Sequence, residues 1–121
     1  YEQAGISNPL EEIDVAEVHD CFTMTEILNY EDLGFVKKGE GPAFVKSGAS
    51  RLGGKLPVNT SGGLKSCGHP IGATGARVIS DLTDQLLGRS EKRQVIGAKR
   101  ALGHTLGGPG SVSSVFVLSK N

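Results

Sequence analysis

Glycine is concentrated in two stretches of this sequence, and the first of them leads directly into a helical pattern. Eight of the 18 glycines lie between Gly48 and Gly75, and four lie between Gly103 and Gly110. They follow no fixed period, which excludes a collagen-like repeat, and they are too localised for a low-complexity chain. Glycine permits backbone shapes and close approaches that other residues do not. We therefore expect two loops with a local need for such backbone.

An amphipathic helix pattern follows the first glycine-rich stretch. Pro70 suits the first helical position, apolar residues recur at helical spacing, and Gly88 is a typical stop. The spacing predicts a helix over Pro70–Leu87. Its predicted apolar face consists of Ile71, Val78, Ile79, Leu82, Leu86 and Leu87.

The residues before that stretch predict a strand, a helix and a long loop. Apolar and acidic residues alternate over Ile13–Val18, which is typical of a half-buried strand, and helical spacing over Cys21–Leu33 predicts a helix that stops at Gly34. Residues 35–69 show little periodicity and much Gly, Pro, Ser and Asn. We expect an extended functional loop or lid-like segment there, because loops of this length are uncommon in purely structural roles.

Two further strands are predicted near the C-terminus, over Val95–Leu102 and Val112–Leu118, with a loop over Gly103–Gly110 between them. The order is then strand, helix, loop, helix, strand, strand. This order predicts a layered α/β fold in which helices flank a mixed sheet, with at least one crossover connection. At 121 residues we expect one domain over residues 1–121.

The net charge of zero hides a division along the chain. Residues 1–40 carry ten acidic and two basic side chains, whereas residues 41–121 carry three acidic and eleven basic ones. The division is compatible with a surface for an anionic partner or with two complementary faces of one domain. Scattered basic residues, few aromatic residues and a pI near 7.0 argue against nucleic-acid binding.

Targeting and redox signals point to a soluble protein inside the cell. No apolar run approaches the ~18 residues that span a bilayer, and the start at Tyr1 has no signal-peptide pattern. Cys21 and Cys67 are too few for a disulfide framework, so we expect free thiols in a reducing compartment, and a single bridge between them is the alternative. We predict a cytoplasmic protein, or a peroxisomal or mitochondrial one in a eukaryote. The first residue is not Met, so we also expect a piece of a longer chain.

His69 is the residue of the first glycine-rich stretch that is best suited to acid–base chemistry. With Pro70 at the first helical position, His69 would lie at or next to the N-cap, where the positive end of the helix disfavours a charged imidazole. A neutral ring can accept a proton at pH 7. Glycines on both sides, including Gly68, leave room for a substrate. His69 is thus a candidate base; the competing interpretation is a histidine that only caps the helix.

The same stretch resembles the Asn-x-x-Gly-Gly…Gly-His-Pro-x-Gly-x-Ser/Thr-Gly signature of the thiolase family. The matching residues are Asn59, Gly62, Gly63, Gly68, His69, Pro70, Gly72, Thr74 and Gly75. His19-Asp20-Cys21-Phe22 is similar to the His-Asp-Cys-Phe variant of the lipid-transfer (sterol-carrier-type) branch. A segment from His104 to Gly108 stands where other thiolases carry a Cys-x-Gly loop, and that cysteine is missing here. The resemblance covers essentially the whole chain and corresponds to the C-terminal part of a thiolase.

The resemblance implies a role for each matching residue. His69 would activate the nucleophilic cysteine that accepts the acyl group, and His19 would line the oxyanion site. Cys21 would take over the acid/base role of the missing cysteine. Gly107 and Gly108 would keep the wall beside the thioester thin and supply N–H groups.

Each of these residues also has a purely structural interpretation. Asn59 is predicted, together with Gly68, to bind substrate. The structural interpretation, which is favoured for Asn59, is that it holds the shape of its loop. Cys21 can be a small buried residue, and His19 can bond backbone groups only. His104 can hold the last two strands together, and Cys67 is expected to be inert.

The resemblance implies a reaction and partners. We expect the C-terminal catalytic part of an acyltransferase that uses acyl-CoA and 3-oxoacyl-CoA in Claisen condensation or thiolytic cleavage. Coenzyme A would be substrate or product, with no permanently bound cofactor and no metal. The nucleophile would come from an N-terminal thiolase half, in a protein that forms a homodimer, and the isolated piece would be inactive. Two alternatives stay open: a thiolase-like retro-aldolase subunit for steroid-CoA side chains, and a non-catalytic acyl-CoA or lipid-binding domain.

Overall fold

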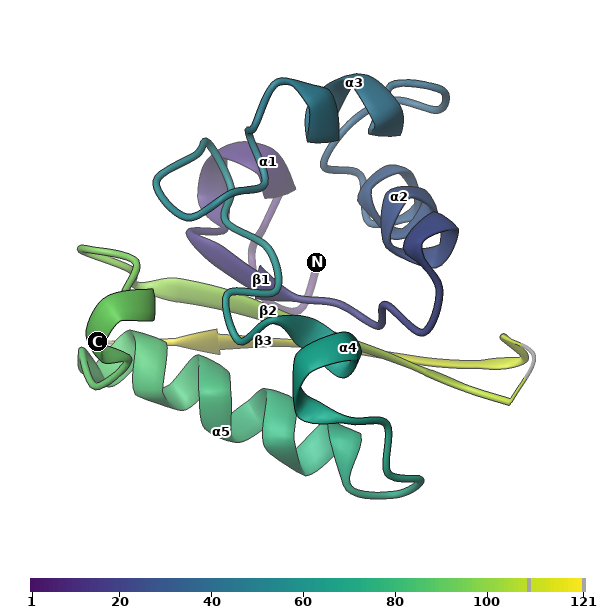
Figure 1. Cartoon of the computed structure of the whole chain (residues 1–121). Coiled ribbons are helices and arrows are strands. Elements are labelled where there is room, and N and C mark those ends of the chain that lie inside the picture. The colour runs from purple at the N-terminus through teal and green to yellow at the C-terminus, as the bar shows by residue number, and fades with distance from the viewer. Residues whose placement is uncertain (109, 121) are drawn as a thin grey trace.

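A three-stranded mixed sheet forms the middle layer of the molecule in a computed structural model that describes residues 1–108 and 110–120 (Figure 1). Strand β1 (Val15–Glu17) pairs in parallel with β2 (Arg100–Gly107), and β2 pairs antiparallel with β3 (Val112–Ser119). The strand order is therefore β1-β2-β3. The mixed sheet that the sequence predicts is confirmed.

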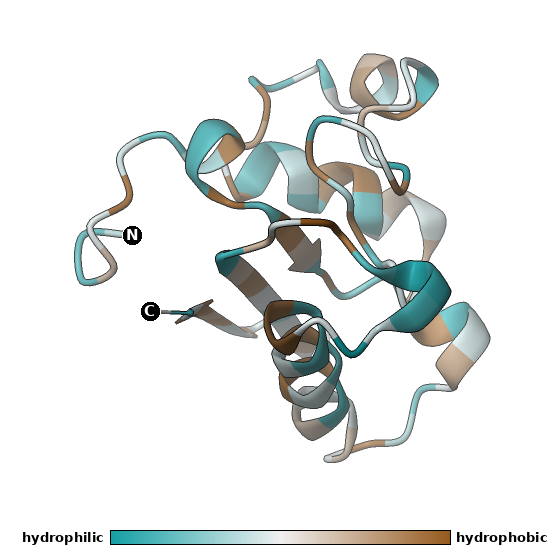
Figure 2. Cartoon of the chain, turned by 90° about the vertical axis from the view of Figure 1, so that its left-hand side faces the viewer, coloured by the Kyte–Doolittle hydropathy of each residue, from teal (hydrophilic) through white to brown (hydrophobic). Residues whose placement is uncertain are grey.

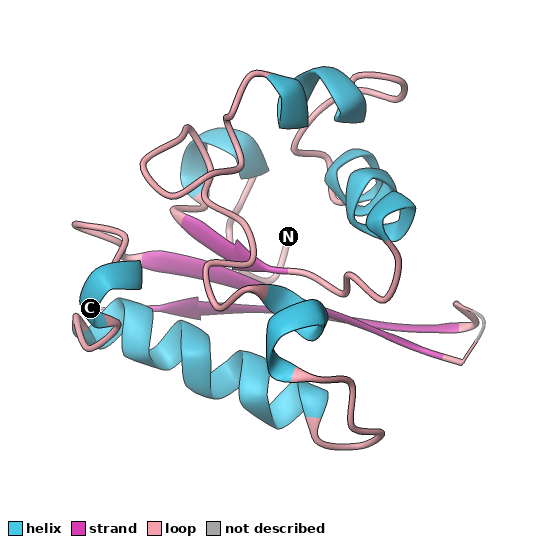
Figure 3. Ribbon diagram, in the orientation of Figure 1, coloured by secondary structure: helices cyan, strands magenta, loops and turns pink. Residues whose placement is uncertain are grey.

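Helices cover both faces of this sheet (Figure 3). On one face lies α5 (Thr74–Leu87). The layer opposite contains α1 (Pro9–Glu12), α2 (Thr23–Asp32) and α3 (Gly41–Lys46). The short α4 (Gly63–Cys67) precedes α5, and a 3-10 helix, η1 (Glu91–Arg93), follows it. Because β1 and β2 are parallel neighbours, everything from α2 to η1 forms one crossover connection, as expected for a layered α/β fold.

Two apolar cores lie on the two sides of the sheet (Figure 2). On the α5 side, Val15 and Ala101 pack with residues of the helix and its C-terminal connection: Val78, Leu82, Leu86 and Ala98. On the other side, Ala16 and Leu102 pack with the larger core: Ile6, Ile13, Val18, Tyr30, Leu33, Phe35, Phe44, Leu56 and Val58. The alternation follows from the two-residue period of a strand.

The first strand differs from its sequence prediction because it is buried on both faces. All three residues of β1 are buried, and the carboxylate-bearing Glu17 is only 1% exposed. Glu17, the one acidic residue of β1, is therefore not on a solvated face. The parallel pairing with β2 explains this, since parallel strands are usually covered on both sides.

Helix α5 begins four residues later than predicted. Thr74 is its first residue, and Pro70 starts a turn in which the N–H of Ala73 bonds to the Pro70 carbonyl oxygen at 3.2 Å. Ile71 therefore lies outside the helix and is fully exposed, while Ile79 is 47% exposed. The predicted end is confirmed: Gly88 takes φ +73° just after the last helical residue.

The strand predicted over Val95–Leu102 is shifted toward the C-terminus. A turn around Gly97, with φ +78°, occupies its first half, and β2 runs on through His104 to Gly107. The predicted loop over Gly103–Gly110 therefore begins too early. Gly103 lies within a strand because the ring of Phe116, its cross-strand partner, covers it: a Cβ there would approach the ring to 2.1 Å.

Residues 35–69 are not one extended loop, because they contain α3 and α4. Both helices are too short to show a helical period, as is α1, which the sequence did not predict. Helix α2 is also shorter than the predicted Cys21–Leu33. None of the helices over residues 1–108 and 110–120 has the length and apolar character needed to cross a membrane.

Candidate active site

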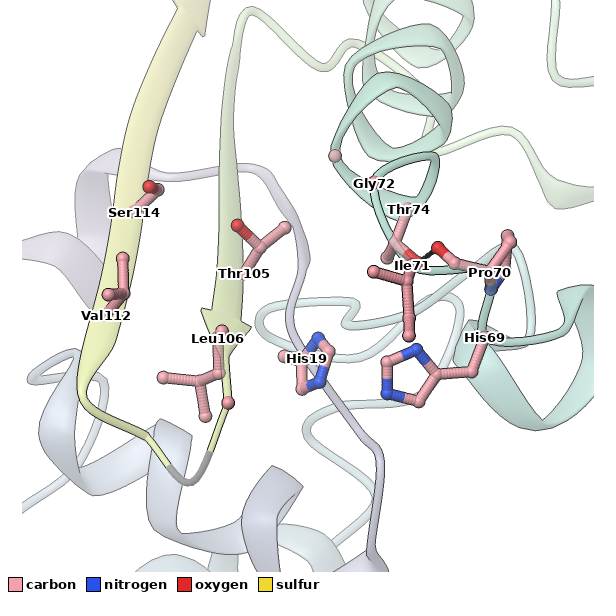
Figure 4. Close-up of a pocket in the computed structure, with 13 residues that line it drawn as sticks. His19, His69, Pro70, Ile71, Gly72, Thr74, Thr105, Leu106, Val112 and Ser114 are labelled. Atoms are coloured by element: carbon pink, nitrogen blue, oxygen red, sulfur yellow. Dashed lines mark hydrogen bonds between the residues drawn. The ribbon is translucent and has the colours of Figure 1, made fainter.

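A cavity of about 360 Å³ opens between the β2–β3 hairpin and the turn that leads into α5 (Figure 4). One wall comes from the hairpin: Thr105, Leu106, Gly107, Gly108, Val112 and Ser114. The other wall comes from the first glycine-rich stretch: His69, Pro70, Ile71, Gly72, Thr74 and Gly75. His19, which follows β1, lies between them. The two glycine-rich stretches thus meet at one cavity.

Two histidines from segments far apart in the sequence meet at this cavity. The ring centroids of His19 and His69 are 4.9 Å apart, and the ring planes make an angle of 78°. Figure 4 shows the two rings side by side at the cavity. His19 is 6% exposed, whereas His69 is exposed. A buried and an accessible imidazole in contact are suited to proton transfer at one reacting group.

Burial controls the charge of His19. Loss of solvent lowers the pKa of His19, the positive charge of His69 lowers it further, and the nearby Asp20 carboxylate opposes both effects. The ring is therefore uncharged near neutral pH. Its buried Nδ1 makes no hydrogen bond within the described part of the chain. An uncharged imidazole can donate one hydrogen bond and accept another.

The structure corrects the predicted position of His69. Ala73 is the N-cap of α5, so His69 lies four residues before it, between α4 and the turn. The hydroxyl of Thr74 bonds back to the Pro70 carbonyl oxygen at 3.3 Å. The positive end of the helix therefore does not act on His69 directly, and His69 does not cap the helix. Its neighbour His19, rather than a helix terminus, defines its surroundings.

Asp20 explains why the first residue of α4, Gly63, is a glycine. Its Oδ1 accepts a hydrogen bond from the backbone N–H of Leu64 at 2.8 Å. Gly63 has φ +65°, and a Cβ at this position would lie 2.1 Å from Asp20 Oδ2. Only glycine allows the backbone to approach this carboxylate so closely.

Asn59 holds the start of the same loop against β1. It takes φ +53°, its Oδ1 accepts a hydrogen bond from the N–H of Val18 at 2.8 Å, and its own N–H donates to the Ala16 carbonyl oxygen at 2.8 Å. Asn59 does not line the cavity. Its substrate-binding role stays a prediction.

The predicted glycines divide between the cavity and its surroundings. Gly107 and Gly108 line the cavity, and Gly108 takes φ +59° just after β2. Gly68 ends α4 with φ +82° and does not line it. Gly68, the sequence neighbour of His69, therefore shapes the turn before it.

Both cysteine thiols are free, and neither lines the cavity. Cys21 is half-buried before α2, with its Sγ 3.7 Å from the Thr25 hydroxyl oxygen. Cys67 is exposed, with its Sγ 3.5 Å from the Ser61 carbonyl oxygen. The geometry brings His19 and His69 together and leaves Cys21 two residues beyond His19.

His104 is buried within β2 and does not line the cavity. Its Nε2 lies 3.1 Å from the Ser113 hydroxyl oxygen on β3. Burial lowers the pKa of His104, the charge of His19 lowers it further, and Asp32 opposes the change. The contact with Ser113 links the two strands of the hairpin.

Sequence reasoning missed the polar residues on the strand faces. Thr105 and Ser114 are cross-strand partners on the cavity wall. A strand extended to Gly107 would have placed Thr105 and Gly107 on one face by the two-residue period. Glu17 and His19 are likewise two residues apart in the sequence.

No three His, Cys, Asp or Glu side chains gather as metal ligands over residues 1–108 and 110–120.

The family described as thiolase C-terminal domain-like matches residues 1–120. The chain belongs to the thiolase family. An acetyl-CoA acetyltransferase of Methanothermobacter thermautotrophicus is 49% identical to this thiolase domain over 109 residues, which are 90% of the domain and 28% of the relative. Human sterol carrier protein 2 is 49% identical over 112 residues, which are 93% of the domain and 20% of the relative. The resemblance to the lipid-transfer-type branch is confirmed.

A more distant relative and a solved structure agree with this assignment. The benzoylsuccinyl-CoA thiolase subunit BbsB of Thauera aromatica is 42% identical over 109 residues, covering 89% of this thiolase domain and 28% of the relative. The structure of an Ltp2-ChsH2(DUF35) aldolase matches with a TM-score of 0.82 at 29% identity, over 98% of this chain and 29% of that one. The thiolase domain thus spans less than a third of the length of these relatives.

Proposed function

We propose that this thiolase domain is the C-terminal catalytic part of an acyltransferase that forms or cleaves 3-oxoacyl-CoA thioesters, with coenzyme A as substrate or product. The contact between the His19 and His69 rings at 4.9 Å, beside a glycine-lined cavity, carries the proposal. The names of the acetyltransferase and the thiolase subunit among the relatives support the same chemistry.

His69 serves as the base of the first half-reaction in this proposal. Its exposed ring takes the proton of a cysteine thiol that belongs to a part of the protein outside this chain. The thiolate attacks the carbonyl carbon of the acyl-CoA, the bond from that carbon to the coenzyme A sulfur breaks, and His69 returns the proton to the departing sulfur. The products are a cysteine thioester and free coenzyme A.

His19 stabilises the oxyanion that forms on the thioester during this step. Because the ring is buried and uncharged near neutral pH, it offers an N–H donor without adding a fixed charge. The backbone at Gly107 and Gly108 lets the thioester approach the opposite wall.

Cys21 moves the proton at the α-carbon in the second half-reaction. It takes that proton from the acetyl unit of a second acyl-CoA, the carbanion attacks the acyl-cysteine carbonyl, and the carbon–sulfur bond to the nucleophile breaks. The sequence match and its place two residues after His19 support this role. The Cys21 sulfur lies outside the present cavity lining, so it has to turn toward the acyl group.

Thiolysis of a 3-oxoacyl-CoA by the complete protein tests the proposal. We expect His69→Ala to lower kcat/KM by about 100-fold or more, the usual range for loss of a general base. Cys21→Ala should lower it as well, whereas Cys67→Ala, which removes an exposed thiol outside the cavity, should not. Normal thiolysis by His69→Ala would refute the proposal.

The similarity to the Ltp2-ChsH2(DUF35) aldolase favours a second candidate, a retro-aldolase for steroid-CoA side chains. A retro-aldol cleavage needs no acyl-cysteine. Retention of Cys21 and His69 supports the thiolase reaction instead. A protein that cleaves a 3-hydroxyacyl-CoA and never carries an acyl group on cysteine would identify the aldolase.

The proposal includes the remainder of the protein. The coverage of 28% and 20% of two relatives supports an N-terminal partner half, which would supply the nucleophile. We also propose a homodimer in the cytoplasm, with no permanently bound cofactor.

A further inference from the structure

Besides the Asn59 contacts, two buried carboxylates hold the loop that carries His69, one on each side of His19 in the sequence. Before His19, Glu17 accepts hydrogen bonds from the Ser61 N–H at 3.0 Å and from the Ser61 hydroxyl at 2.6 Å. After His19, Asp20 accepts the hydrogen bond of the Leu64 N–H at 2.8 Å. His19 therefore lies between the two carboxylates that hold the loop.

Arg77 extends the first of these contacts to α5. Its Nη1 donates to the Ser61 hydroxyl oxygen at 3.0 Å and lies 3.7 Å from Glu17 Oε2. The same nitrogen donates to Asp81 Oδ2 at 2.7 Å. The Ser61 hydroxyl thus accepts from α5 and donates to β1. Strand, loop and helix are joined at this one residue.

Glu17 is an unusual residue for a strand that is covered on both faces, because its side chain is a carboxylate and is only 1% exposed. Burial raises the pKa of this carboxyl group, and the two Ser61 hydrogen bonds partly oppose that rise. An apolar residue here would avoid the desolvation cost of a buried charge. The Glu17 carboxylate, through its charge and its hydrogen bonds, instead fixes the position of one specific partner, the loop that leads to His69.

We propose that Glu17, acting through Ser61 and Arg77, is a positioning residue that keeps the His69 ring against the His19 ring. Its importance for acyl transfer rests on the proposed function, whereas the positioning itself can be tested in the chain alone. Glu17 does not touch the cavity and is therefore not a catalytic residue.

Proton NMR of the chain measures the contact directly, because the chain has only three histidines and each ring can be assigned by a single His→Gln substitution. Rings with centroids 4.9 Å apart give a nuclear Overhauser cross-peak between His19 and His69. We expect Glu17→Gln and Ser61→Ala to weaken this cross-peak strongly. Glu12→Gln, the same change at a carboxylate paired with Arg100 instead, should leave it intact.

A folded Ser61→Ala chain with a full cross-peak would overturn the positioning role, even where Glu17→Gln fails to fold. In the complete protein, we expect Glu17→Gln to lower kcat about tenfold or more while KM changes less than about twofold, because a displaced base affects the chemical step more than binding. A weakened cross-peak with unchanged kcat would overturn the catalytic importance of the contact. If the protein transfers no acyl groups, the NMR result still decides the positioning role.

Discussion

At the scale of single residues, two buried histidines make the stability of the fold sensitive to acid. Burial is the largest cause of the lowered pKa of His19 and of His104. Below pH 6.5, the ordinary pKa of histidine, the unfolded chain therefore binds protons at these residues that the folded chain does not bind. The stability that these residues provide is present above pH 6.5 and is lost as the pH falls through their lowered folded values.

We predict that the urea midpoint of unfolding falls between about pH 7.5 and about pH 5.5, and that it falls less in His104→Gln. Glu17 acts in the opposite direction, because its raised pKa makes the folded chain take up a proton as the pH falls. Both chains keep Glu17, so its effect cancels in the comparison. An equal fall in the two chains would contradict the assignment of the acid sensitivity to His104.

Gly63 gives a second prediction at this scale. In Gly63→Ala the new methyl group would meet the Asp20 carboxylate at 2.1 Å, and the residue would keep a φ of +65°. We expect a loss of about 3 kcal/mol, from strain plus overpacking. Gly88→Ala, with φ +73° and no atom within 4 Å of the Cβ, should lose only about 1 kcal/mol in the same denaturation experiment. Equal losses would show that Asp20 does not restrict this position.

Individual residues also show what sequence can and cannot predict. The match to a family motif places His69 and His19 at one site from the sequence alone, and the two rings do lie in contact. The predicted influence of a helix N-terminus on His69 is wrong, because the helix begins at Thr74 and not at Pro70. The alternating pattern predicts a solvated Glu17, since alternation alone cannot distinguish a strand that is covered on both faces.

At the scale of elements, α5 provides a test of which face meets the sheet. Leu82 is fully buried against the sheet, whereas Ile79 is 47% exposed although the sequence pattern predicts both on one apolar face. We predict that Leu82→Ala costs about 3 kcal/mol of unfolding free energy and Ile79→Ala less than about 1 kcal/mol. Similar costs measured by urea unfolding would mean that the helix is rotated from the described position.

Element boundaries are harder to predict than element types. Gly103 has the character of a loop residue, yet it is a strand residue that makes room for the Phe116 ring of the neighbouring strand. Such contacts depend on a partner far along the sequence. The helices α1, α3 and α4 have four to six residues each, so no periodic pattern can reveal them.

At the scale of the whole molecule, the layered arrangement explains how the site is assembled. The charge division does not follow the layers, because residues 1–40, with ten acidic side chains, include α1 and α2, whereas α3 of the same outer layer belongs to the more basic remainder. The crossover from β1 to β2 brings the segment after β1, the loop before α5 and the β2–β3 hairpin to one cavity. The proposed acyl transfer needs these three segments together.

The most direct test of the proposed acyl transfer is the mass of the complete protein after mixing with acetyl-CoA. We predict an acetyl group on a cysteine outside this chain, formed by the unchanged protein and by Cys21→Ala, and absent or formed about 100-fold more slowly in His69→Ala. Acetylation of His69→Ala at the unchanged rate would contradict the role of His69 as the base.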